Sequence, residues 1–125
     1  MKQPILAENA PKAIGPYSAA VKTDLFVFSA GQLGMNPQSG ELVEGGIQTQ
    51  TRQALKNLEQ VLLAAGTDLS KVVKTTVFLK DMSEFSLMNE VYAEFFTADF
   101  PARSAVQVAA LPKNAAVEIE AIALR

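Results

Sequence analysis

The segment 47–79 constrains the fold of this chain more than any other. Apolar side chains recur at spacings of three and four over 47–65, and Gly66 follows as a helix C-terminal cap. The next apolar stretch, 72–79, is rich in β-branched residues, which favour a strand. An amphipathic helix leading into a strand indicates an α/β fold, and we expect this strand to lie centrally in the sheet.

The other elements follow from the same periodicities. Residues 1–11 are typical of irregular structure, and the glycines at 31 and 34 predict a bend or a close backbone approach. Further strands are predicted at 18–22 and 25–30, paired as a hairpin, and at 104–110 and 116–124, with a second helix at about 84–97 capped by Asp81 and Ser83. This order predicts one domain, residues 1–125, in which a single mixed sheet carries both helices on one face. The other face then needs its own cover.

Composition limits the partners. No apolar run approaches the roughly 20 residues of a membrane span, although 49% of the residues are hydrophobic and the mean hydropathy is +0.15. Subunit contact is the simplest use of the excess apolar surface. A net charge of −2 with scattered lysines argues against nucleic acid as the primary partner. The start of the chain lacks the pattern of a secretory signal, so we expect a cytoplasmic protein.

The chain has neither cysteine nor histidine. Their absence excludes disulfides, thiolate metal sites, cysteine nucleophiles and mechanisms with an imidazole base. Catalysis would therefore depend on carboxylates, Arg or Lys, hydroxyls, amides, backbone groups and water.

Arg103 is the most informative charged residue. It lies between Pro101 and an apolar run, where a permanent charge is costly to bury without an anionic partner. Either its stem packs on the sheet while its head reaches water or a carboxylate, or its guanidinium binds the carboxylate of a small ligand. The sequence leaves both interpretations open.

Glu118 and Glu120 share one face of the last strand, about 6.8 Å apart along it. A pair of this kind is ordinarily solvated. Ile122 and Leu124 continue the same face, however, which indicates a boundary where a carboxyl group can have a raised pKa and transfer protons.

Six stretches of the chain form a recognisable set: 13–18 (AIGPYS), 29–32 (SAGQ), 73–81 (VKTTVFLKD), 89–92 (NEVY), 100–106 (FPARSAV) and 117–123 (VEIEAIA). Together they resemble the reactive-intermediate deaminase family, also called the RidA or YjgF family. The resemblance runs nearly end to end and is most specific at 100–106.

The resemblance implies a chorismate-mutase-like α/β fold assembled as a homotrimer, with the sheets forming a central barrel and three sites in clefts between subunits. It also implies hydrolysis of 2-imino acids to 2-oxo acids and ammonia, without cofactor or metal. The substrates would include 2-iminobutanoate and 2-iminopropanoate released by pyridoxal-phosphate dehydratases.

By the same resemblance, Arg103 holds the substrate carboxylate and Glu118 orients or deprotonates the attacking water. The other candidate substrate-binding residues are Tyr17 as pocket lining, Gly31 through its amide, Asn89 across the interface, Ser104 within the Arg103 motif, and Ala105 through its carbonyl.

Two positions depart from the family pattern. Many relatives have serine at the position of Ala30, whereas in this chain the hydroxyl lies one residue earlier, at Ser29. Many relatives also have cysteine at the position of Ala105. The missing hydroxyl leaves a second hypothesis open: a trimeric protein that captures small carboxylates, as a sensor or chaperone-like regulator, without turnover. A ribonuclease or translation inhibitor is a third hypothesis, which the acidic composition disfavours.

Overall fold

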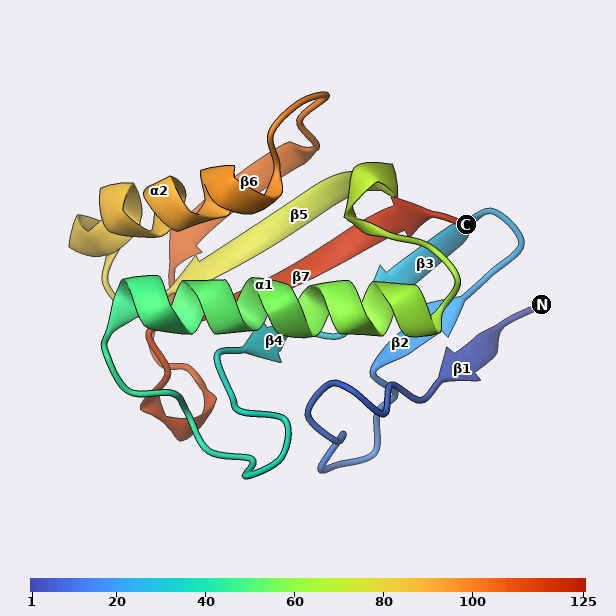
Figure 1. The fold of residues 1–125 in the computed structure, drawn as a ribbon, viewed down its shortest axis with the longest axis horizontal. Helices are drawn as coiled ribbons and strands as arrows, with labels where there is room; N and C mark the ends of the chain where they lie inside the picture. Colours follow the sequence, from blue (N-terminus) through green and yellow to red (C-terminus); the bar gives the residue numbers. More distant parts are fainter.

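The predicted mixed sheet is present and contains every strand of the chain. A computed structural model describes all 125 residues (Figure 1). The strands are β1 (Gln3–Ile5), β2 (Ala20–Lys22), β3 (Phe26–Ser29), β4 (Gln32–Leu33), β5 (Val72–Leu79), β6 (Ala102–Gln107) and β7 (Val117–Leu124). The helices are α1 (Ile47–Ala64) and α2 (Phe85–Phe95), with short 3-10 turns η1 (Leu69–Lys71), η2 (Met82–Glu84) and η3 (Pro112–Asn114).

The last strand, β7, lies at the centre of the sheet. The order is β1-β2-β3-β7-β5-β6, and β4 also pairs with β7. Only β5 and β6 are parallel; every other pair is antiparallel. The predicted hairpin is confirmed as β2 and β3. β5 has a neighbour on each side, as an interior strand should, but β7 takes the middle by inserting between β3 and β5.

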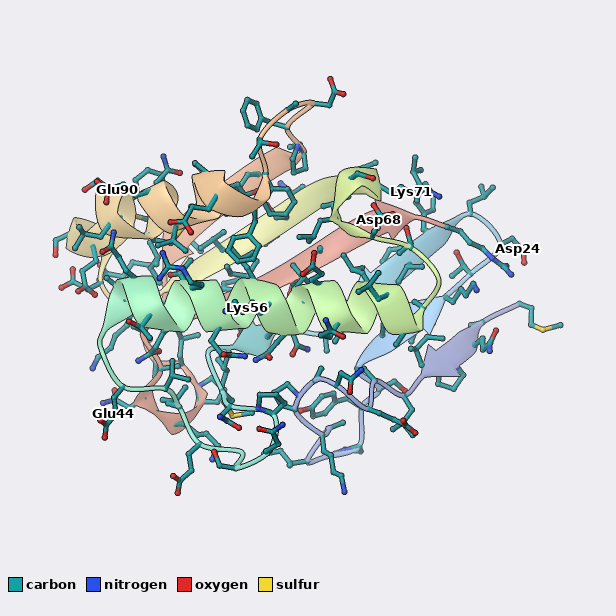
Figure 2. The ribbon with its side chains drawn as sticks, in the orientation of Figure 1. Asp24, Glu44, Lys56, Asp68, Lys71 and Glu90 are labelled. Atoms are coloured by element: carbon teal, nitrogen blue, oxygen red, sulfur yellow. The ribbon has the colours of Figure 1, made fainter.

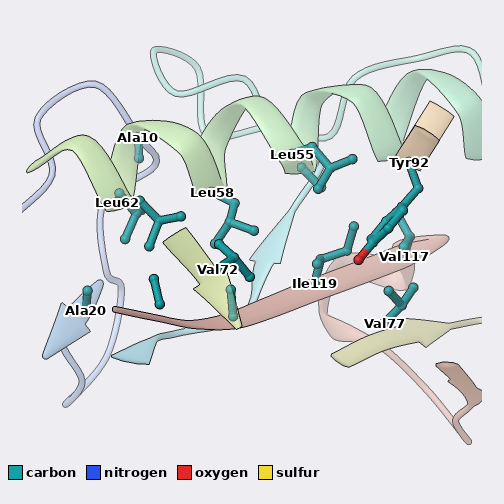
Figure 3. Packing of buried hydrophobic residues seen from close by; sticks show 14 of the residues in the cluster. Ala10, Ala20, Leu55, Leu58, Leu62, Val72, Val77, Tyr92, Val117 and Ile119 are labelled. Atoms are coloured by element: carbon teal, nitrogen blue, oxygen red, sulfur yellow. The ribbon is translucent and has the colours of Figure 1, made fainter. Parts of the chain in front are cut away.

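Both helices cover the same face of the sheet (Figure 1). The side chains of Leu55, Leu58 and Leu62 project from α1 toward the sheet (Figure 3), in one buried cluster with Val77 and Ile119. All five are fully buried, and burying a side chain of this size contributes roughly 1.5–3 kcal/mol. The amphipathic pattern of 47–65 therefore directs α1 onto the sheet, and Gly66, with φ +84°, ends it as predicted.

The opposite face of the sheet carries apolar side chains without cover. Phe28, Val106 and Leu124 are 41%, 43% and 46% exposed on it. They share the face with the half-buried Phe78 and Ile122. An apolar surface of this kind is typical of interaction sites. The expectation of an uncovered sheet face is therefore confirmed.

Several elements differ from the predicted ones, and three of the differences have a clear physical reason. β1 lies in the stretch predicted to be irregular, because Pro4 and its exposed neighbours give no apolar pattern to a short edge strand. β6 spans Ala102–Gln107 rather than 104–110, because its parallel pairing follows β5. α2 is shorter than 84–97, and Asp81 caps η2 by accepting a hydrogen bond from the Ser83 amide at 2.9 Å.

Charged side chains are spread around the molecule. The residues labelled in Figure 2 lie on loops and turns and on the outward sides of both helices, with acidic and basic groups interspersed: Asp24, Glu44, Lys56, Asp68, Lys71 and Glu90. Neither helix combines the length and the hydropathy needed to span a membrane.

Candidate active site

Arg103 lies on the helix-covered side of the sheet, on edge strand β6. Its register partner on β5 is the buried Thr75. The guanidinium carbon lies 4.6 Å from the centre of the Tyr92 ring and 5.3 Å from that of the Phe85 ring. Nη1 donates a hydrogen bond of 2.7 Å to Asn89 Oδ1. One helix, α2, thus supplies the rings and the amide that hold the guanidinium.

No carboxylate of the chain pairs with Arg103. The ion pairs are those of the N-terminus of Met1 with Asp24 and of Arg52 with Glu94. Aromatic faces and an amide oxygen hold a guanidinium without neutralising it. The half-buried Arg103 therefore keeps its full charge and spare N–H donors for an anion.

Tyr92 is fixed in place by a buried hydrogen bond. Its hydroxyl lies 2.8 Å from Thr75 Oγ1. Burial raises the pKa of Tyr92, while the bond to Thr75 and the charge of Arg103 act in the opposite direction. Because the net shift is upward, the phenol stays protonated at ordinary pH and adds no negative charge beside Arg103.

Glu118 lies on the uncovered face. Its partner on β5 is Phe78, three residues from Thr75, the partner of Arg103. Side chains alternate along a strand, so Arg103 and Glu118 point to opposite faces of the sheet. Burial raises the pKa of the half-buried Glu118 carboxyl, and the charge of Glu120 raises it further. Glu118 therefore lies, as predicted, where the polar and apolar halves of the β7 face meet, with a raised pKa.

Gly31 lies directly against the Glu118 side chain. A β-carbon at position 31 would lie 2.7 Å from Glu118 Cδ and 2.8 Å from Oε2, closer than such atoms approach. Only glycine leaves room for the carboxylate in this position. A hollow of about 110 Å³ beside the two residues is also lined by Tyr17, which is 53% exposed.

Sequence reasoning missed Asn57, which holds the backbone of this region. Its side-chain amide, on a buried stripe of α1, donates hydrogen bonds to the carbonyls of Leu33 at 3.0 Å and Met35 at 2.8 Å. The available signal was a polar residue between Leu55 and Leu58 in the apolar helix pattern, because a buried amide requires partners.

The hydroxyl of Ser29 is occupied by the sheet. Ser29 Oγ accepts a hydrogen bond from the Ala121 amide at 2.9 Å. Ala30, the next residue, has no hydroxyl to offer in its place. The chain therefore lacks a free hydroxyl immediately before Gly31.

Ser104 and Ala105 flank Arg103 differently. Ser104 Oγ accepts a hydrogen bond of 2.9 Å from Lys74 Nζ, and strand alternation turns it away from Arg103. The side chain of Ala105 packs against the core, opposite Val77. Among the predicted partners of Arg103, Asn89 is the one whose side chain contacts the guanidinium within the chain.

The predicted residues therefore form two groups on opposite faces. We call Arg103 with Phe85, Asn89 and Tyr92 the anion cluster, and Tyr17, Gly31 and Glu118 the acid cluster. The first can bind a carboxylate, and the second can accept and return a proton. No group of three His, Cys, Asp or Glu side chains is arranged to hold a metal ion.

Comparisons with known proteins agree over the whole chain. The family model described as Endoribonuclease L-PSP matches residues 7–125. The human 2-iminobutanoate/2-iminopropanoate deaminase is 50% identical over 125 residues, which are 100% of this chain and 91% of that protein.

Solved structures give the same result. The Rid-family protein YyfA of Yersinia pestis has a TM-score of 0.96 at 50% identity, covering 100% of both chains. TdcF of E. coli, solved with bound serine, has a TM-score of 0.94 at 44% identity, covering 98% of both chains. With a match of this extent and the same two-helix mixed sheet, the chain belongs to the Endoribonuclease L-PSP family, the RidA/YjgF family that its motifs predicted.

Proposed function

We propose that this protein hydrolyses 2-imino acids, such as 2-iminobutanoate and 2-iminopropanoate, to 2-oxo acids and ammonia. The observation that carries the proposal is the guanidinium of Arg103, held by rings and an amide and left without a carboxylate. All these substrates carry a carboxylate group, whose two oxygens match the paired N–H donors of a guanidinium. The human relative is named for this reaction.

In the proposed reaction Arg103 binds the substrate carboxylate and places the imine carbon near Glu118. Glu118 accepts a proton from water as the water oxygen bonds to that carbon and the C=N bond becomes a single bond. Glu118 passes that proton to the nitrogen, which gives a carbinolamine with one hydroxyl and one amino group. Glu118 then takes the hydroxyl proton and returns it to the amino nitrogen. As the C–O bond becomes a carbonyl, the C–N bond breaks, and the 2-oxo acid and ammonia leave. The raised pKa of Glu118 suits a group that both takes and returns a proton.

The remaining candidates have supporting roles in this proposal. Tyr17 lines the hollow beside Glu118, and the amide of Gly31 is available next to the carboxylate. Ser104 and Ala105 contribute backbone groups next to Arg103, including the Ala105 carbonyl for water or the imine nitrogen. An imine hydrolyses unaided, so a positioned water and one carboxylate suffice; such help is worth about 10²- to 10⁴-fold.

We further propose that the site forms between copies in a homotrimer. A single chain holds Arg103 and Glu118 on opposite faces, and the face of Glu118 is apolar and uncovered. Packing that face against another copy buries the apolar surface and brings the acid cluster of one chain to the anion cluster of the next.

Mixed assemblies test this arrangement directly. Arg103→Ala and Glu118→Gln chains should each be strongly impaired alone. Random co-assembly of equal amounts gives about a quarter of the sites an intact Arg103 from one chain and an intact Glu118 from the other. Recovered activity after joint refolding supports shared sites. No recovery, with mixed trimers demonstrated by mass spectrometry, places both residues of a site in one chain and overturns the proposal.

The activity itself is tested with a pyridoxal-phosphate threonine dehydratase. The dehydratase supplies 2-iminobutanoate, release of 2-oxobutanoate is followed, and semicarbazide traps the remaining imine. The protein should accelerate release and reduce trapping. A rate equal to that in buffer, or full activity in Arg103→Ala, defeats the proposal. A link to such dehydratases and a cytoplasmic location remain predictions from the sequence.

One observation favours a second candidate, capture of small carboxylates without turnover. The hydroxyl of Ser29 is bonded to the sheet and Ala30 has none, so one polar contact is missing beside Gly31. Calorimetry that finds 2-oxobutanoate binding while imine hydrolysis is absent would select this candidate. The family description also names an endoribonuclease; salt-sensitive RNA binding would be its first requirement.

A further inference from the structure

One face of α2 is built around the guanidinium of Arg103. Phe85, Asn89 and Tyr92 are spaced by four and three residues, so they form a single stripe along the helix. All three contact Arg103, two through their rings and one through a hydrogen bond. A surface helix needs no such stripe to pack on a sheet, since apolar side chains alone would do so.

We propose that Tyr92 is a positioning residue, which sets the direction of the Arg103 guanidinium through its ring and its hydrogen bond to Thr75. The inference rests on the proposed function, because the ligand that Arg103 receives is the carboxylate of a 2-imino acid. Tyr92 itself touches no substrate in this proposal.

The arrangement explains why a phenol is present rather than a simple apolar residue. Thr75 is the register partner of Arg103, so the hydroxyl bond of 2.8 Å anchors the ring at the point where Arg103 leaves β6. The ring is the nearer of the two aromatic groups, with its centre 4.6 Å from the guanidinium carbon. A flexible arginine is thereby restricted to few rotamers before the ligand arrives.

The same arrangement keeps the charge of Arg103 available. A carboxylate in the place of Tyr92 would hold the guanidinium equally well but would neutralise it. Because burial raises the pKa of Tyr92, the phenol remains neutral and competes with no anion. Tyr92 thus positions the Arg103 guanidinium without neutralising its charge.

The test compares Tyr92→Leu, Tyr92→Phe and Thr75→Val in the trimeric protein, with imine hydrolysis and 2-oxobutanoate binding as readouts. Losing the ring should raise KM and the Kd for 2-oxobutanoate about tenfold, with kcat changed less than about threefold. Tyr92→Phe and Thr75→Val keep the ring and lose only its anchor, so each should raise KM by about threefold. These milder changes remain informative if Tyr92→Leu does not fold.

Val91→Ala is the matched control. Val91 is buried on the same helix and supplies neither a ring nor a hydrogen bond to Arg103, so its truncation should lower Tm and leave KM unchanged. In an Arg103→Ala background, Tyr92→Leu should cause no further loss of binding, because the two residues act as a unit. Tyr92 variants that lower Tm as Val91→Ala does, with KM and Kd unchanged, overturn the inference.

The outcome is distinguishable from failure of the proposed function. If the wild type binds 2-oxobutanoate through Arg103 but hydrolyses no imine, the proposed function fails and the Kd series still decides the role of Tyr92. If the wild type neither binds nor hydrolyses, both are overturned.

Discussion

The anion cluster and the acid cluster are built in contrasting ways on the two faces of one sheet. Arg103 is held by named partners, with an amide at 2.7 Å and two ring faces. The Glu118 side chain instead packs against Gly31, where the absence of a β-carbon leaves space for the carboxylate. Its raised pKa comes from burial and from Glu120, with no hydrogen bond among the causes.

The difference matches what each group has to do. A group that binds a fixed charge gains from being restricted before the ligand arrives. A group that takes and returns a proton needs a pKa near the working pH and freedom to reach two atoms in turn. The comparison therefore predicts that damage to the anion cluster appears mainly in KM, and damage to the acid cluster mainly in kcat.

Removing the guanidinium should have the largest effect. Arg103→Ala loses two charge-assisted hydrogen bonds to the substrate, and at about 2 kcal/mol each this corresponds to about a 10³-fold fall in kcat/KM. Steady-state kinetics on dehydratase-generated imine measures it.

Arg103→Lys is the matched control for this prediction. It retains the charge and loses the planar fork, so its kcat/KM should lie between those of the wild type and Arg103→Ala. If Arg103→Ala lowers kcat and leaves KM unchanged, the prediction that damage to the anion cluster appears mainly in KM is wrong.

Removing the acid should have the next largest effect. Glu118→Gln keeps the size of the side chain and loses the proton acceptor, so kcat should fall about 10²-fold while KM changes little. The acidic limb of the pH profile should disappear with it. Retention of that limb in Glu118→Gln would show that another group titrates.

The sequence predicted the elements with strong periodicity. The strand at 72–79 and the helix from 47 were read directly from their patterns. It could not predict β1, because Pro4 and its exposed neighbours carry no pattern and the strand exists only by pairing with β2. The central place of β7 is likewise a property of the tertiary pairing.

The site was predictable residue by residue but not as an arrangement. The motifs singled out Arg103, Glu118 and Gly31, yet their division between two faces depends on the register of β5 with β6 and β7. Asn89 bonds to Arg103 within the chain, and its contribution across an interface stays a prediction. The contact of Tyr92 joins a helix and a strand, which no local pattern encodes.

Filling the space at Gly31 should have a smaller effect. In Gly31→Ala the new β-carbon would displace the end of the Glu118 side chain, which is flexible, so the fold should survive with little change in Tm. Displacement of a catalytic group by about 1 Å lowers kcat by about 10- to 10²-fold.

The Glu118→Gln background provides the control for this substitution. Without the carboxylate to displace, Gly31→Ala should cause little further loss of kcat. An equal loss of kcat in the wild type and in Glu118→Gln would mean that Gly31 is needed for the backbone conformation and not for the position of Glu118.

The smallest effect should come from Glu120, which acts on Glu118 only through its charge. Activity should rise with pH through the pKa of Glu118, because the proposed base works as a carboxylate. Glu120 raises that pKa, so Glu120→Gln should move the acidic limb of kcat/KM to lower pH and increase activity below the midpoint. Glu120 is exposed in the single chain, and where it stays in contact with solvent a Debye length of about 3 Å at 1 M salt screens its charge. In 1 M salt the pH profile of the wild type should therefore approach that of Glu120→Gln. A shift of the acidic limb to higher pH in Glu120→Gln would contradict the assignment of Glu118 as the base.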